Sequence, residues 1–320
     1  MKNLINESLY VFLRLFGSTI SPVLLGWSTW KENSRLILDN VRLPVIWRNM
    51  KRYRRFVVYN TPATLLNNLS SQIPSFLLSF FFSTTIVGYY AFGNQLLRMP
   101  MSLVGGSIGQ AFYSYASTAK QEGNFAEFVE KNFRQLIEYS FFFMLILSII
   151  GKPLCIVFFG GEWAEAGGYI QILSIWMVFW FISSPMSQLY SVLQKNELFL
   201  GLNLVILVTR IASIWLGGVL ESPRLALLFF SISGAVVYGF LGAFIIFFSG
   251  VPWRRIVRII LENLSISILA GGILFSFKLI HVVSWAQLIM TVFFIGIYFA
   301  YRFKDDEIVN RFLAKRMSIH

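Results

Sequence analysis

Two arginine residues stand inside long apolar runs, where a charged side chain needs either a ligand or a partner. Arg98 lies near the middle of the run 86–117, two residues before Pro100, and Arg210 lies inside 197–219. Placing an arginine at membrane depth costs at least ~2.5 kcal/mol. A guanidinium can offset that cost by forming paired hydrogen bonds with a phosphate or an acidic sugar group. The alternative for both residues is an interhelical lock to a carbonyl, an Asn or a Glu.

Amide side chains crowd the same part of the chain, whereas the stretch 225–303 contains only Asn263 and Gln287. Amides at membrane depth are tolerated only where they face protein or water. We therefore predict that the first full spans surround a hydrated cavity and that the later spans mostly face lipid. The predicted substrate path consists of Asn60, Asn67, Asn68, Gln72, Asn94, Gln95, Arg98 and Arg210.

Prolines follow the same distribution, because the four apolar runs after residue 196 contain none. A proline inside a helix removes a hydrogen bond and kinks or breaks the helix. The predicted hinges or broken helices are at Pro62, Pro74, Pro100, Pro153 and Pro185.

Motifs for bond chemistry are weak. Residues 105–109 (Gly-Gly-Ser-Ile-Gly) match the G-x-S-x-G elbow formally, but that motif needs a strand-to-helix turn and these residues lie in a helical run. Close helix packing through Gly105 and Gly109 is the favoured interpretation. Cys155 is the single cysteine, and the two histidines are His281 and His320, so no metal site is predicted. The sequence predicts a protein that is not an enzyme and needs no cofactor.

Composition places the chain in a membrane. It is 56% hydrophobic and 13% charged, about half the charge of a typical soluble domain. Since a bilayer core needs ~20 apolar residues per helix, the chain can supply eight full spans and a weaker one at 9–27. The eight predicted spans are 57–82, 86–117, 136–159, 166–194, 197–219, 225–248, 260–280 and 283–303.

The basic residues orient these spans. Twenty Lys and Arg residues lie in 28–55, 118–135, the 195 region, 249–258 and the tail from 302. The alternate connections hold only Arg224 and Lys278. The positive-inside rule then places the first set, and the C-terminus, in the cytoplasm.

The segment 28–55 carries eight basic residues with Trp47 and seven aliphatic residues between them. A basic amphipathic stretch with a tryptophan is typical of a helix lying on anionic lipid. The net charge of +12 could also indicate nucleic acid, but the charges flank the spans and form no basic face interleaved with aromatics. We predict that 28–55 contacts membrane lipids and that the chain binds no nucleic acid.

Three patches, in order across roughly residues 55–250, resemble the C-terminal lobe of bacterial polysaccharide flippases, the Wzx-type members of the multidrug/oligosaccharidyl-lipid/polysaccharide exporter superfamily. The first patch is Asn60-Thr61-Pro62 with Leu65, Leu66, Asn67, Leu69 and Pro74. The second is Val87-Gly88-Tyr89-Tyr90 with Asn94, Leu97, Arg98, Pro100, Gly105, Ile108, Gly109, Gln110 and Phe112. The third is Phe159-Gly160-Gly161-Glu162-Trp163 with Ala166-Gly167, Ile172-Leu173 and Ser184-Pro185.

The resemblance implies two six-helix lobes and two extra helices, of which this chain would supply the second part. The predicted fold is an all-α polytopic membrane protein with about eight full transmembrane helices plus one weak N-terminal helix. The implied division is 1–27 as a remnant of the last N-lobe helix, 28–55 as a cytoplasmic linker, 56–249 as the C-terminal lobe, 250–303 as two appended helices and 304–320 as a cytoplasmic tail.

The resemblance also implies a function. It is the flipping of undecaprenyl-pyrophosphate-linked oligosaccharide across the bacterial inner membrane, for O-antigen, lipopolysaccharide or exopolysaccharide biosynthesis. Implied partners are the lipid-linked oligosaccharide and polysaccharide polymerase or chain-length proteins. Alternating access needs two lobes, so a start further upstream, a truncated and inactive product, or pairing of two chains is expected.

Three alternatives stay open. A multidrug extruder would want carboxylates in its cavity, and Arg98 argues against one. A membrane polysaccharide polymerase or glycosyltransferase would want acidic residues or histidines in a large outer loop, and the only outward carboxylates are Glu162, Glu165 and Glu221. A structural remnant without activity is the third.

Overall fold

The computed structural model describes residue 20, residues 23–24, 26–34 and 43–279, and residues 285, 289–291, 293 and 296. The predicted N-terminal span 9–27 therefore lies largely outside the described residues, as does most of the last predicted span, 283–303. The cytoplasmic tail 304–320 lies wholly outside them. The chain divides into two compact units, residues 1–58 and residues 59–320.

The described part of the chain is helical and contains no strand. Seven long helices, with a short 3₁₀ turn and a one-turn helix between them, follow in the order α2 (Leu43–Phe81), α3 (Thr84–Gln121), α4 (Phe125–Phe159), η1 (Gly161–Trp163), α5 (Ala164–Met186), α6 (Leu189–Val192), α7 (Asn196–Val219), α8 (Pro223–Ser249) and α9 (Trp253–Leu279).

Local residue choice explains where several helices begin and end. Ser83 precedes α3, and its Oγ accepts a hydrogen bond from the Ile86 N–H. Ser222 does the same for the Leu225 N–H, and Pro223 occupies the first position of α8. These are favoured helix starts, because the serine oxygen satisfies a free N–H and proline needs no N–H partner there. Gly250 ends α8 in the left-handed conformation (φ 74°) that glycine adopts without strain.

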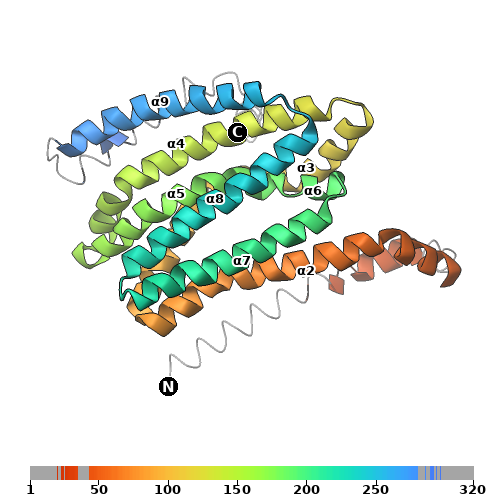
Figure 1. Cartoon of the computed structure of the whole chain (residues 1–320), viewed down its shortest axis with the longest axis horizontal. Coiled ribbons are helices and arrows are strands. Elements are labelled where there is room, and N and C mark those ends of the chain that lie inside the picture. Colours follow the sequence, from red (N-terminus) through yellow and green to blue (C-terminus); the bar gives the residue numbers. More distant parts are fainter. Residues whose placement is uncertain are drawn as a thin grey trace. The chain divides into compact units, whose positions relative to one another are not determined.

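Helix α5 is the central helix of the second unit. It packs against α3, α4 and α8, while α7 lies beside α8 and α9 lies beside α4 (Figure 1). The segment Gly161–Val192 includes α5, and 61% of its apolar 18-residue window is buried, against 33% of the corresponding windows of α4 and α7. A helix that is apolar all round is typical of such an interior position.

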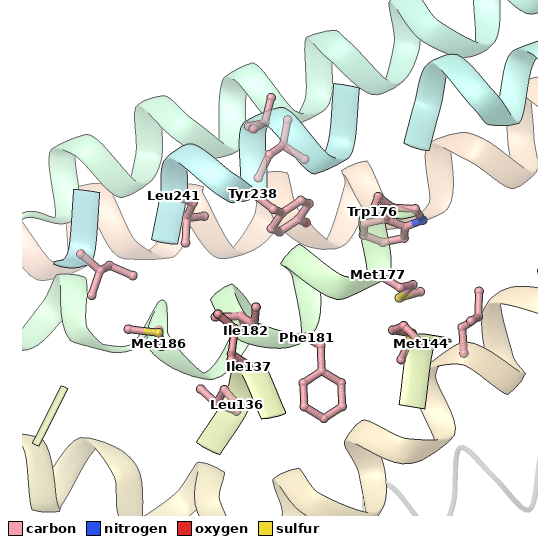
Figure 2. Close-up of a cluster of buried hydrophobic side chains, with 14 of the residues drawn as sticks. Leu136, Ile137, Met144, Trp176, Met177, Phe181, Ile182, Met186, Tyr238 and Leu241 are labelled. Atoms are coloured by element: carbon pink, nitrogen blue, oxygen red, sulfur yellow. The ribbon is translucent and has the colours of Figure 1, made fainter. Parts of the chain in front are cut away.

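The core forms where α4, α5 and α8 meet. Figure 2 shows Leu136 and Ile137 of α4, Trp176 and Phe181 of α5, and Tyr238 of α8 in one cluster. Trp176 and Phe181 are almost completely buried. The ring centroids of Trp176 and Tyr238 are 5.7 Å apart, which joins the core directly to the polar groups described below.

Glycine sets the closest helix approach. A Cβ added at Gly167 of α5 would lie 2.4 Å from the Lys152 Cα of α4, whereas one added at the adjacent Gly168 meets nothing within 4 Å. We expect Gly167→Ala to lower the free energy of unfolding by roughly 2 kcal/mol, because the clash is with backbone that must move. Gly168→Ala, the matched control, should leave the thermal midpoint in detergent unchanged. Equal midpoints for the two variants would contradict this packing.

Four segments of the described residues are long and apolar enough to cross a membrane: α4, Gly161–Val192, α7 and α8. Helices α2 and α3, which carry most of the amides, are long enough to cross a membrane but are not among these four apolar segments. The all-α membrane fold is confirmed, and the predicted total of eight spans stays a prediction.

Several predicted boundaries differ from the observed helices. The span predicted at 57–82 is the second part of a helix that begins at Leu43, so the basic linker and this span share one continuous helix. The span predicted at 136–159 begins earlier, at Phe125. The span predicted at 166–194 is interrupted at Ser187 and Gln188, after Pro185.

Candidate functional site

Arg98 of α3 is half-buried and lies against Trp180 of α5. Its Cζ is 4.6 Å from the centre of the Trp180 ring, and its Nε donates to Asn94 Oδ1 at 3.4 Å. Stacking over an indole holds the guanidinium by a cation–π attraction while leaving its remaining N–H groups available. No carboxylate pairs with it in the described part of the chain. The geometry therefore presents a fixed, unpaired cation.

Arg210 of α7 is in a different situation, because only 5% of it is exposed. Its Nη1 donates to Ser70 Oγ of α2 and its Nη2 to the Tyr238 hydroxyl of α8, both at 3.0 Å. Its Cζ lies 5.7 Å from the ring centre of Trp176 and 6.0 Å from that of Tyr238. Arg210 thus joins three helices, which is the interhelical lock considered above as the alternative to a ligand.

The two guanidinium groups share one electrostatic environment. The buried Tyr90 interacts with both Arg98 and Arg210, and the two arginines repel each other. Neither residues 59–81 of α2 nor α3 nor α8 contains any Asp or Glu, and α7 has only Glu197 in its first turn. Two neighbouring positive charges that pair with no carboxylate among the described residues favour an anionic ligand.

The amides on α2 form one exposed side of that helix. Thr64, Asn67, Asn68 and Ser71 are exposed, and Thr64 and Ser71 each lie three or four residues from both asparagines, so the four share one side of the helix. Asn67 lies 14 residues before Phe81, and Arg98 lies 14 residues after Thr84. At 1.5 Å per residue, both lie about 21 Å from the short α2–α3 turn. The polar face of α2 and Arg98 of α3 are therefore about equally far, along their own helices, from that turn.

The structure brings together only part of the predicted path. Asn94 contacts Arg98, and Asn67 lies beside Trp180. Asn68, Gln72 and Gln95 are exposed and Asn60 is half-exposed, and no side-chain hydrogen bond is described for any of these four. They stay predictions as members of the path.

A small cavity of ≈ 40 Å³ opens between α2, α5, α7 and α8. Its polar lining consists of Asn67, Ser183, Ser184, Ser187, Asn203 and Tyr238, and its apolar lining of Trp180, Phe199, Ile206 and Leu241. Trp180 thus belongs both to the cavity lining and to the cation–π contact of Arg98, which does not itself line the cavity.

The predicted hinges differ in their surroundings. Pro62, Pro74, Pro100 and Pro153 lie within helices that continue past them without interruption in the described backbone. Pro185 precedes the interruption at Ser187 and Gln188, where the polar cavity is found. The broken-helix prediction fits the structure best at Pro185.

Sequence reasoning missed Trp180, Tyr238, Ser70, Ser184 and Asn203. Each is a common residue in a helical run, and it gains its role from residues on other helices. From the sequence alone, only Asn203 could have been recognised, because it is a polar residue inside the apolar span 197–219.

A larger surface groove of ≈ 670 Å³ lies at the other polar region, around the α3–α4 turn and the start of α9. Its charges are largely paired, since Arg255 contacts Glu130 at 3.0 Å, and Arg134 contacts Glu262 at 3.4 Å. Exposed ion pairs of this kind contribute little stability. The groove also carries the carboxylates Glu127 and Glu130, which oppose an anionic ligand, so it is the weaker candidate for binding one.

Comparison with known proteins finds a family match and a solved structure with a similar fold. Residues 10–168 match the family model described as "Polysaccharide biosynthesis protein". No curated protein sequence matches the chain. Among solved structures, the chain is similar to "Lipid II flippase MurJ, inward closed conformation", with a TM-score of 0.60 and 15% sequence identity over 80% of this chain. The match spans 56% of the MurJ chain, little more than half its length.

The family match and the fold agree with the resemblance of the sequence patches, and four of the described helical segments are long and apolar enough to cross a membrane. The chain is therefore a polytopic helical membrane protein, about half of which matches the polysaccharide biosynthesis protein family and whose fold is similar to that of a lipid flippase.

Proposed function

We propose that the chain takes part in moving a lipid-linked oligosaccharide across the inner membrane, and that it catalyses no bond chemistry. The observation that carries the proposal is the Arg98–Trp180 stack, in which a guanidinium is held over an indole ring and pairs with no carboxylate in the described part of the chain. A phosphate or pyrophosphate supplies the missing negative charge, and the amides suit sugar hydroxyls. The lipid chain then lies against the apolar helices.

The fold similarity to a lipid flippase and the family match support this assignment. The family resemblance further implies undecaprenyl pyrophosphate as the carrier and O-antigen or exopolysaccharide assembly as the process. The scarcity of carboxylates beside Arg98 argues against transport of organic cations, because those substrates need an anionic cavity.

Orientation follows from the basic connections. With the basic ends in the cytoplasm, Ser187, Gln188 and the cavity beside them lie toward the cytoplasmic side of the lobe. Substrate assembled in the cytoplasm would meet this site on entry.

The first unit supports a second contact with lipid. Trp27, Trp30 and Trp47 are exposed by 72%, 54% and 71%, and Lys31 and Arg48 beside them are also exposed. Exposed tryptophans among basic side chains are typical of the interface between lipid head groups and acyl chains.

The proposal is tested by ligand-dependent stabilisation of the purified chain in detergent. We expect a polyprenyl-pyrophosphate saccharide to raise the thermal midpoint, because a ligand that binds only the folded state stabilises it. The uncharged polyprenol is the matched control and should produce little shift. Equal shifts with both lipids would contradict an anion-binding role.

A further inference from the structure

Another cavity lies at the end of the second unit where α4 ends and where α5 and α8 begin. It has a volume of ≈ 270 Å³, just below the roughly 300 Å³ at which ordinary ligand pockets begin. Helix α4 supplies Lys152 to its lining, α8 supplies Arg224, and the rest comes from α5 between Ala164 and Ile172. Among the described residues, none from α2, α3 or α7 lines it. This Lys152 cavity is therefore separate from the Arg98 site.

The Lys152 cavity contains a cation that is not neutralised by an ion pair. Arg224 is occupied by Glu165, because its Nε donates to Oε1 at 2.8 Å and its Nη2 donates to Oε2 at 2.5 Å. Lys152 is exposed and acts on Glu165 electrostatically, but it forms no ion pair or hydrogen bond within the described part of the chain. Since the charges of Arg224 and Glu165 cancel, the lining has a net positive charge. A negatively charged group is its complement.

The position of Lys152 suits the head group of a lipid. Lys152 lies seven residues before Phe159, the last residue of α4, which is about 10 Å along the helix axis. A lysine at this depth can extend its aliphatic stem along the helix and place its ammonium near the membrane surface. The phosphate of a bilayer lipid lies in that layer, so the two charges can meet there.

An exposed apolar stripe on α5 continues from the cavity. Gly168 and Ile172 line the cavity, and Ile175 and Phe179 follow at spacings that keep them on the same side of the helix. Ile175 is 43% exposed and Phe179 is 39% exposed, although most of α5 is buried. Figure 1 shows α5 between α4 and α8, and it packs against both. The stripe offers an apolar surface to an acyl chain whose head group lies in the cavity.

We propose that this face binds an anionic phospholipid of the bilayer, with its phosphate at Lys152 and one acyl chain along Ile172, Ile175 and Phe179. Basic pockets between transmembrane helices recognise anionic lipid head groups, and the apolar stripe explains why a lipid is favoured over a soluble anion. The inference does not depend on the proposed function, because none of these residues belongs to the Arg98 site.

Photo-crosslinking in vesicles tests the site. The purified full chain carries a benzophenone amino acid at Ile175, in equal parts of phosphatidylglycerol and phosphatidylcholine with identical acyl chains. We expect phosphatidylglycerol adducts to exceed phosphatidylcholine adducts by about fivefold, the effect of one basic side chain near a head group.

Val208 of α7 is the control position for the crosslinker. It is 56% exposed and lies eleven residues before Val219, just as Ile175 lies eleven residues after Ala164. Both are therefore about 17 Å, along their helices, from the end of the unit that holds the Arg224–Glu165 pair. At Val208 we expect a ratio close to one. Equal ratios at Ile175 and Val208 would overturn the site.

Two exposed lysines of α4 provide the variant and its matched control. Lys152→Gln should lower the ratio at Ile175 to that at Val208, whereas Lys131→Gln, at the other end of the helix, should leave it near fivefold. Gly168→Leu is a second variant, because a Cβ added there meets nothing within 4 Å and a larger side chain can fill the cavity. It should also abolish the preference. A preference that survives Lys152→Gln would overturn the assignment.

A polyprenyl-pyrophosphate saccharide added to the same vesicles distinguishes the two kinds of anionic lipid. Continued phosphatidylglycerol adducts at Ile175 would support the phospholipid site. Their replacement by saccharide-bearing adducts would overturn it and would place the transported lipid on this face. Arg98→Ala should not change the ratio at Ile175, so this site and the proposed function can fail independently.

Discussion

Arg98→Ala is expected to reduce transport of the lipid-linked saccharide by about 100-fold or more while leaving the folded protein in the membrane. Truncating one partner of a desolvated charge pair costs roughly 2–5 kcal/mol, and 2.7 kcal/mol corresponds to about 100-fold. The side chain makes one long hydrogen bond, at 3.4 Å, and one ring contact within the described protein. Its loss should therefore affect the ligand more than the fold.

The measurement is surface polymer in cells that depend on this chain, together with its abundance in the membrane. Arg98→Lys keeps the charge but loses the planar fork and the stacking on Trp180, so we expect transport between that of the unmodified chain and that of Arg98→Ala. The exposed Arg224, which pairs with Glu165, provides the control variant Arg224→Ala with normal transport. Normal surface polymer in Arg98→Ala would refute the assignment, and loss of the protein itself would favour a structural lock.

Arg210→Ala should have its main effect on stability. The substitution removes two hydrogen bonds of 3.0 Å and leaves the Ser70 and Tyr238 hydroxyls without their donor in a buried position. Unmade buried hydrogen bonds cost about 1–3 kcal/mol each, so we expect a loss of roughly 3 kcal/mol in the free energy of unfolding. Removing an uncompensated charge offsets part of this cost.

Thermal unfolding in detergent measures the effect, with Tyr238→Phe as the companion variant. Tyr238→Phe alone should lower the midpoint less than Arg210→Ala does, because the second hydrogen bond, to Ser70, survives. The double variant should fall short of the sum of the two single effects, since both remove the same bond. A normal midpoint combined with lost transport in Arg210→Ala would show instead that Arg210 is a substrate ligand.

The sequence predicted the membrane class, the concentration of polar groups in the first full spans, and Arg98. These features follow from residue type and linear position alone, because charges and amides are costly in lipid wherever the chain goes. It did not predict Trp180 beneath Arg98, or Ser70 and Tyr238 around Arg210. Such partners come from separate helices, and only the packing of those helices brings them together.

The sequence also predicted the helix boundaries only in part. The start of α2 at Leu43 lies far before the predicted span, because the basic segment is itself a good helix former and no breaker separates it from the apolar run. The interruption at Ser187 was predicted as a hinge or broken helix at Pro185 without a choice between the two, since a proline can kink a helix or end it. The cavity depends on that interruption and could not be foreseen.

The most direct test of the central claim is to locate the saccharide lipid in the membrane by photo-crosslinking. A benzophenone amino acid is placed at Asn68, on the exposed polar side of α2, or at Phe247, which is 75% exposed on α8. We predict a saccharide-bearing adduct at Asn68 that is lost when Arg98→Ala is added, and little adduct at Phe247. Equal adducts at the two positions, or an Asn68 adduct that persists without Arg98, would contradict a substrate path beside the arginine.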